Sequence, residues 1–148
     1  MTTTLSEQFQ QSRGKAIQFD GQLIHPMFQK KINKNKNFLI RRLKVIDSPL
    51  QGLRIKVVGG EIEVNNQSHP EIILWADTSP ESVIISVSSK NGCDLKIWNV
   101  WKIDDLTQAW VGNAGMVINE MGKVVTLECS GGVAEVDFSN LVVEIEEL

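Results

Sequence analysis

Beyond residue 14, apolar residues occur in short runs that turn residues interrupt at intervals of roughly eight to twelve positions. Within these runs apolar and polar residues often alternate, and Val and Ile are frequent, which is typical of β-strands. None of the runs shows helical spacing. The pattern predicts about ten to thirteen strands in an all-β, antiparallel two-sheet sandwich, with an open β-barrel as the alternative.

The one helical pattern lies at the N-terminus. Thr4 and Glu7 have the spacing of a capping box, and Gly14 is a natural stop for a helix. Leu5 and Phe9 are its only large apolar residues, so the helix has little surface to bury. We therefore expect residues 1–14 to form a short helix or a disordered tail, within a single domain that spans residues 1–148.

Four dipeptides between apolar runs have compositions typical of two-residue hairpin turns. They are Asp20-Gly21, Gly59-Gly60, Asn91-Gly92 and Asp104-Asp105. Each predicts that the two strands beside it pair with one another. Across Gly59-Gly60 this pairing would place Val57 opposite Ile62 and Lys56 opposite Glu63, so that one side of the hairpin is apolar and the other is charged.

Pairing across the last two of these turns would sort the side chains of residues 83–111 onto two faces, because successive residues of a strand point to opposite sides. One face is almost purely apolar and is assigned to the core: Val83, Ile85, Val87, Trp98, Val100, Ala109 and Val111. The other face mixes apolar residues and hydroxyls with the indoles and amides of Asn99, Trp101, Gln108 and Trp110, and the loop residue Asn113 adjoins it.

Two interpretations of this mixed face remain open. Indoles beside amides suit a wet recognition surface for a partner protein or a sugar. A central strand that packs on both sides would instead bury the same residues.

A basic segment is the second candidate site. QKKINKNKN, residues 29–37, is predicted to be a loop that leads into a strand at Phe38. Its candidate binding residues are Lys30, Lys31, Lys34, Lys36, Arg41 and Arg42. They could hold a phosphorylated ligand, or they could form a solvated loop and a charged edge strand.

Charge is distributed unevenly along the chain. Residues 1–74 carry a net charge of +5 and residues 75–148 a net charge of −8. This asymmetry could direct a partner or a self-contact, unless folding mixes the two signs on the surface. The overall charge of −3 argues against general nucleic-acid binding.

No catalytic, metal or cofactor motif is found. His25 and His69 each precede a proline, and neither has a Cys or acid at ligand spacing. Cys129 precedes Ser130-Gly131-Gly132 but lacks the helix of a nucleophile elbow. At 42% hydrophobic residues the chain can form a core without metal or disulfide. Cys93 and Cys129 lie far apart, each in a strand-like segment, so they are predicted to be small core residues.

The expected function is therefore that of a non-enzymatic interaction or accessory protein. It would bind another protein, or a second copy of itself, through the Trp and amide face. The alternative is a small-ligand module that binds carbohydrate on that face or a phosphorylated ligand on the basic segment. Residues 1–12 lack the features of a signal peptide, and no apolar stretch approaches the roughly 18 residues of a membrane span, so we expect a cytoplasmic protein without membrane contact.

Overall fold

The computed structural model describes residues 3–148, in which it has one helix and fourteen strands. The elements are α1 (Leu5–Gln11), β1 (Ile17–Phe19), β2 (Gln22–Ile24), β3 (Phe28–Ile32), β4 (Lys36–Val45), β5 (Gln51–Val58), β6 (Glu61–Val64), β7 (Gln67–His69), β8 (Glu71–Trp75), β9 (Ser82–Ser88), β10 (Cys93–Ile103), β11 (Leu106–Gln108), β12 (Gly115–Met121), β13 (Val124–Ser130) and β14 (Leu141–Glu147).

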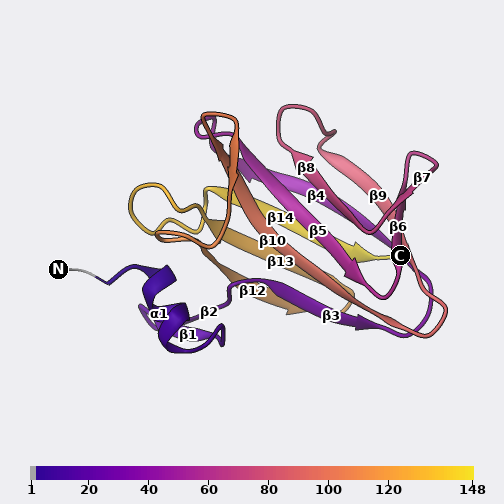
Figure 1. The fold of residues 1–148 in the computed structure, drawn as a ribbon, viewed down its shortest axis with the longest axis horizontal. Helices are drawn as coiled ribbons and strands as arrows, with labels where there is room; N and C mark the ends of the chain where they lie inside the picture. Colours follow the sequence, from indigo (N-terminus) through magenta and orange to yellow (C-terminus); the bar gives the residue numbers. More distant parts are fainter. Residues whose placement is uncertain (1–2) are drawn as a thin grey trace.

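Two antiparallel sheets pack face to face, with β5 and β10 in front of β13 and β14 in Figure 1. The seven-stranded sheet has the order β12-β13-β14-β4-β9-β6-β7. The five-stranded sheet has the order β11-β10-β5-β8, and β3 also pairs with β10. β1 and β2 form a separate hairpin. The predicted all-β sandwich is confirmed, and over residues 3–148 the sheets do not form a closed barrel.

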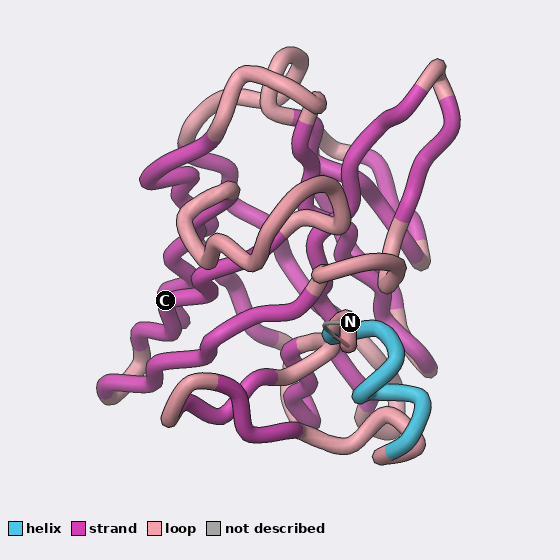
Figure 2. Tube along the Cα trace, turned by 90° about the vertical axis from the view of Figure 1, so that its left-hand side faces the viewer, coloured by secondary structure: helices cyan, strands magenta, loops and turns pink. Residues whose placement is uncertain are grey.

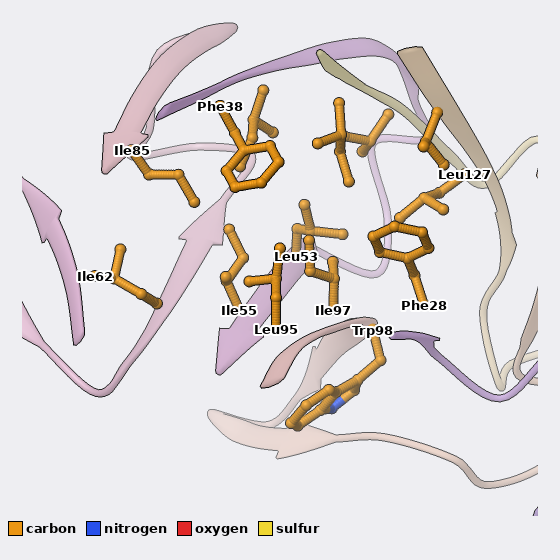
Figure 3. Close-up of a cluster of buried hydrophobic side chains, with 14 of the residues drawn as sticks. Phe28, Phe38, Leu53, Ile55, Ile62, Ile85, Leu95, Ile97, Trp98 and Leu127 are labelled. Atoms are coloured by element: carbon orange, nitrogen blue, oxygen red, sulfur yellow. The ribbon is translucent and has the colours of Figure 1, made fainter. Parts of the chain in front are cut away.

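The core lies between the two sheets, where alternate residues of the facing strands point inward (Figure 3). Leu95 and Ile97 of β10 and Ile55 of β5 are fully buried. From the other sheet, Phe38 of β4 and Leu127 of β13 point toward them and are 3% and 0% exposed. Burial of each such side chain contributes about 1.5–3 kcal/mol to folding, so this layer supplies most of the driving force.

The N-terminal segment packs onto the outside of the sandwich, beside the β1-β2 hairpin (Figures 1 and 2). Leu5 is fully buried against Ile24 and Val117, which gives the short helix the apolar contact that its sequence alone does not provide. Thr4 caps α1, since its Oγ1 accepts a hydrogen bond from Glu7 N at 3.2 Å. The predicted short N-terminal helix is confirmed over Leu5–Gln11.

Two of the four predicted hairpins are confirmed. Across Asp20-Gly21, Phe19 pairs with Gln22. Across Asp104-Asp105, Ile103 pairs with Leu106 and Trp101 with Gln108.

The other two predicted hairpins are wrong, because the chain changes sheets at both turns. β5 pairs with β8 and β10, whereas β6 pairs with β7 and β9. Val57 therefore lies opposite Leu95 instead of Ile62, and Lys56 does not lie opposite Glu63. In the same way, Asn91-Gly92 joins β9 of the seven-stranded sheet to β10 of the five-stranded sheet.

The predicted division into faces fails for β10 as a consequence. Ile85 and Val87 of β9 are buried in the core, as predicted. Trp98 and Val100 are also buried, but they point to the outer side of their sheet, opposite to Leu95 and Ile97; Figure 3 shows Trp98 there. Val111, placed in the core by the sequence pattern, is 47% exposed.

The segment predicted to be a loop over residues 29–37 also differs from the expectation. Residues 29–32 belong to β3, which pairs antiparallel with β10, and β4 already begins at Lys36. Phe28 and Ile32 are buried at the two ends of β3, so its polar appearance comes from the side chains between these two anchors.

Candidate functional site

The outer side of the five-stranded sheet gathers three of the four tryptophans of the chain: Trp75, Trp98 and Trp110. The strand register explains the positions of Trp75 and Trp98. Trp98 of β10 lies opposite Arg54 of β5, and Trp75 of β8 lies opposite Gly52, which precedes Arg54 by two residues on β5. Alternate residues of a strand share a side, so both indoles point outward.

Trp98 and Trp110 form a stacked pair. Their ring centroids lie 4.7 Å apart with an interplanar angle of 28°. Trp98 is the covered member, at 6% exposure, and Trp110 is the outer one, at 42%. Trp110 Nε1 donates a hydrogen bond to Pro26 O at 3.0 Å. Both contacts fix the orientation of an exposed indole, which lowers the entropy lost when a partner covers it.

Trp75 lies against the backbone of the neighbouring strand. A methyl group at Gly52 would lie only 2.6 Å from Cε3 of Trp75, so the ring occupies the space that a larger residue would fill. Lys102 Nζ lies 4.7 Å from the centroid of this ring, within the range of a cation–π contact. The indole is therefore held between Gly52 and Lys102.

Cations surround these indoles. We define the aromatic–basic face as the three tryptophans together with Arg54, Lys56, Lys96 and Lys102. With Lys31, Glu71 and Asp94, which share this side of the sheet, the charges sum to +3 on a chain whose net charge is −3. The face is therefore a positive surface on an acidic protein.

Arg54 connects the charges to the aromatic rings. Its guanidinium lies 5.8 Å from the centroid of a Trp98 ring, and Nη2 donates to Glu71 Oε1. This hydrogen bond, with the charges of Arg54 and Lys56, lowers the pKa of the Glu71 carboxyl against the opposing effect of burial. The ion pair of Arg54 and Glu71 therefore fixes both side chains at one end of the aromatic–basic face.

Glu71 should make folding stability sensitive to acid. Because its pKa is lower in the folded state, the carboxylate stabilises the fold above the ordinary value of about 4.5, and this stabilisation disappears as pH falls through the folded pKa. We expect Glu71→Gln to reduce the loss of urea-unfolding free energy between neutral pH and about pH 3. An unchanged slope of stability against pH, relative to the wild-type chain, would contradict this coupling.

The five residues predicted to form a contact surface do not share a face. Asn99 and Trp101 are 3% and 1% exposed, and Asn99 Nδ2 donates to Ser130 O at 3.0 Å. Gln108 is half-buried at the end of β11. Trp110 lies outside β11 and has a φ of 55°, which interrupts strand alternation and brings it beside Trp98. Asn113 accepts a hydrogen bond from Leu5 N and donates one to Ala134 O, so it anchors α1 and a loop.

The predicted basic segment is divided and in part neutralised. Lys30 and Lys36 form ion pairs with Glu147. Arg41 lies 2.7 Å from Glu144 and 3.4 Å from Glu146.

The remaining residues of the segment point elsewhere. Arg42 donates hydrogen bonds to Ser79, Lys31 lies on the outer side of the five-stranded sheet, and Lys34 is exposed in a turn. The pairing of β4 with β14 thus brings the basic first half and the acidic end of the chain together.

A cleft of about 420 Å³ adjoins the aromatic–basic face. Its lining comes from α1, the turn after it, the segment before β3, β3 itself and Trp110: Ser6, Phe9, Gln10, Arg13, Gly14, Pro26, Met27, Gln29 and Trp110. Four of these residues have apolar side chains, three are uncharged and polar, and Arg13 is the one charged residue among them. Clefts of this size and composition are common at binding sites.

Possible metal ligands and the two cysteines are the remaining reactive groups of the described residues. Within residues 3–148, no group of three or more His, Cys, Asp and Glu side chains could hold a metal ion. Cys93 and Cys129 are buried free thiols, and burial raises the pKa of Cys129 far above its ordinary value. Its thiolate, the reactive form, is therefore strongly disfavoured.

Sequence reasoning missed most of the aromatic–basic face. Trp75, Arg54, Lys56, Lys96 and Lys102 are each unremarkable in the chain, and only the pairing of β8, β5 and β10 brings them together. One signal in the sequence points to this face: Lys96, Trp98 and Lys102 are separated by even numbers of positions, so they share one side of β10. The signal is useful only if that side is known to point away from the core.

In the described part of the chain, no helix is long and apolar enough to cross a membrane. Comparisons with protein-family models, with curated protein sequences and with solved structures returned no match.

Proposed function

We propose that this chain is a non-enzymatic interaction protein that binds an acidic surface of another protein through the aromatic–basic face. The observation that carries the proposal is the stacked pair of Trp98 and Trp110, with a surrounding net charge of +3, on a chain of net charge −3. Trp and Arg are the residues most enriched at the energetic centres of protein interfaces.

The form of the face favours a macromolecular partner. Strand pairing, the hydrogen bond to Pro26 and the contact with Gly52 hold the indoles in place, so little side-chain freedom is lost on binding. The cations around them would speed association with an acidic partner and exclude basic ones. The proposal places the protein in the cytoplasm, where reducing conditions suit its two free thiols.

The two small-ligand alternatives have less support. The sugar hypothesis paired indoles with the amides of Asn99 and Gln108, but Asn99 is buried and bonded to Ser130 O. The phosphorylated-ligand hypothesis used cations of the basic segment, and Lys36 and Arg41 are already paired with carboxylates of β14.

Charge reversal on the face tests the proposal. The triple variant Lys56→Glu, Lys96→Glu, Lys102→Glu changes the local charge from +3 to −3. Used as bait in extracts of the native host, it should capture the specific partner roughly tenfold less than the wild-type chain, because like charges then face each other. Capture by the wild-type chain should also weaken as salt rises.

The matched control is Lys34→Glu, Lys44→Glu, Lys123→Glu, which makes the same change in net charge at exposed positions away from the face. This control should retain the partner. Equal capture by both triple variants, with both folded by circular dichroism, would rule out the face as the contact surface.

A further inference from the structure

We propose that the cleft between α1 and Trp110 holds a large apolar side chain of the partner, next to a partner carboxylate that Arg13 binds. This inference rests on the proposed function and specifies the chemistry of the segment that is recognised. It starts from the cleft lining, in which Phe9, Pro26, Met27 and Trp110 provide apolar walls around about 420 Å³. A space of this size accommodates a Phe, Trp or Leu side chain with part of its backbone.

The backbone conformation at the cleft is unusual. Arg13 and Trp110, both in the lining, have φ values of 59° and 55°. The other non-glycine residues with positive φ are Asp, Asn and one Ala, which are smaller. A left-handed conformation is unfavourable for a large side chain, and such strain tends to gather at binding sites, where the surrounding structure maintains it. Here it directs a guanidinium and an indole to the same cleft.

Besides the apolar side chain, the partner segment is expected to supply a carboxylate, and the charge of Arg13 is the reason. Arg13 forms no ion pair with any carboxylate of the described residues, and the cleft lining contains no acid. Gln10 and Gln29 add amide groups that can bind a peptide backbone. A guanidinium beside an apolar pocket recognises an apolar group that carries a carboxylate close by.

The position of the cleft points to a protein segment as its occupant. Trp110 belongs both to the cleft and to the stacked pair, and Gln29 of the lining lies opposite Lys96 of the face. A chain that inserts a side chain into the cleft would therefore continue directly over the lysines. The same acidic, extended segment then accounts for the charge of the face and for Arg13.

Two-dimensional NMR of the ¹⁵N-labelled full chain tests this inference. The probe is the blocked peptide acetyl-Glu-Phe-Glu-amide, and its controls are acetyl-Gln-Phe-Gln-amide and acetyl-Glu-Ala-Glu-amide. The readout is the indole N–H signal of Trp110, assigned with the variant Trp110→Phe; this N–H donates to Pro26 O at the cleft wall. The same spectra show whether each variant is folded.

We expect the Glu-Phe-Glu peptide to shift the Trp110 signal in a saturable way and to bind about tenfold more tightly than either control peptide. Arg13→Gln should abolish the preference for Glu-Phe-Glu over Gln-Phe-Gln, and Arg13→Lys should retain part of it. Lys34→Gln, which removes an exposed cation elsewhere, should leave both affinities unchanged.

Several results would overturn the inference. They are no movement of the Trp110 signal, an unchanged charge preference in Arg13→Gln, and binding of free phenylacetate as tight as that of the peptide, which would identify a small-molecule site. A Trp110 signal that moves with protein concentration alone would assign the cleft to a second copy of the chain.

The inference and the proposed function fail separately. If partner capture depends on Lys56, Lys96 and Lys102 but the peptides do not bind, the cleft inference is wrong and the face remains the contact surface. If the peptide binds as expected while capture is independent of the three lysines, the proposed function is wrong.

Discussion

Trp101→Ala should destabilise the protein by about 3–5 kcal/mol, the usual cost of removing a fully buried tryptophan. Trp101 is 1% exposed, and a methyl group at Gly132 would lie 2.2 Å from its Cζ2, so the indole fills its site without spare space. In a domain of this length the loss should lower the thermal midpoint by about 10 °C. Differential scanning calorimetry measures both quantities.

Trp110→Ala is the matched comparison. The same substitution removes an indole that is 42% exposed, so it should cost only about 1 kcal/mol, chiefly the stacking on Trp98. The sequence pattern places Trp101 and Trp110 on one binding face. If that were so, both substitutions would lower the thermal midpoint by similar amounts. Equal thermal midpoints would thus contradict the assignment of Trp101 to the core and of Trp110 to the surface.

Gly60→Ala should cost about 1–3 kcal/mol through overpacking. Gly60 lies where the chain passes from β5 to β6, and a methyl group there would lie 2.4 Å from Ser88 O, a backbone atom that cannot move independently. The crossover from β9 to β10 lies against the same position, since Cys93 Cβ would be 3.1 Å away. The substitution would force the two crossovers apart.

Gly122→Ala separates this steric effect from the conformational cost of losing a glycine. Gly122 lies in the turn between β12 and β13 with a φ of 62°, and a methyl group there would meet nothing within 4 Å. Its replacement should cost about 1 kcal/mol from the left-handed backbone alone. Urea unfolding of both variants tests the difference. A smaller loss for Gly60→Ala than for Gly122→Ala would mean that the crossovers are not packed as described.

The candidate site was predictable only in part. Trp110 was recognised from its residue type, and it is exposed in the structure. Its association with Asn99 and Trp101 was inferred from strand alternation, which its φ of 55° interrupts. Trp75 and Arg54 could not be connected with it, because they lie on β8 and β5, and no local signal states which strands share a sheet.

The sequence by itself determined the local features of this protein: the alternation that forms strands, the cap at Thr4, the turns at Asp20-Gly21 and Asp104-Asp105, and enough apolar surface for a sandwich core. Such features depend on residues within a few positions of one another. Only the tertiary structure decided whether Gly59-Gly60 and Asn91-Gly92 close a hairpin or carry the chain between sheets. A two-residue turn fits either path, and the free energy that selects one comes from burying Leu95, Ile97 and Trp101 against strands distant in sequence.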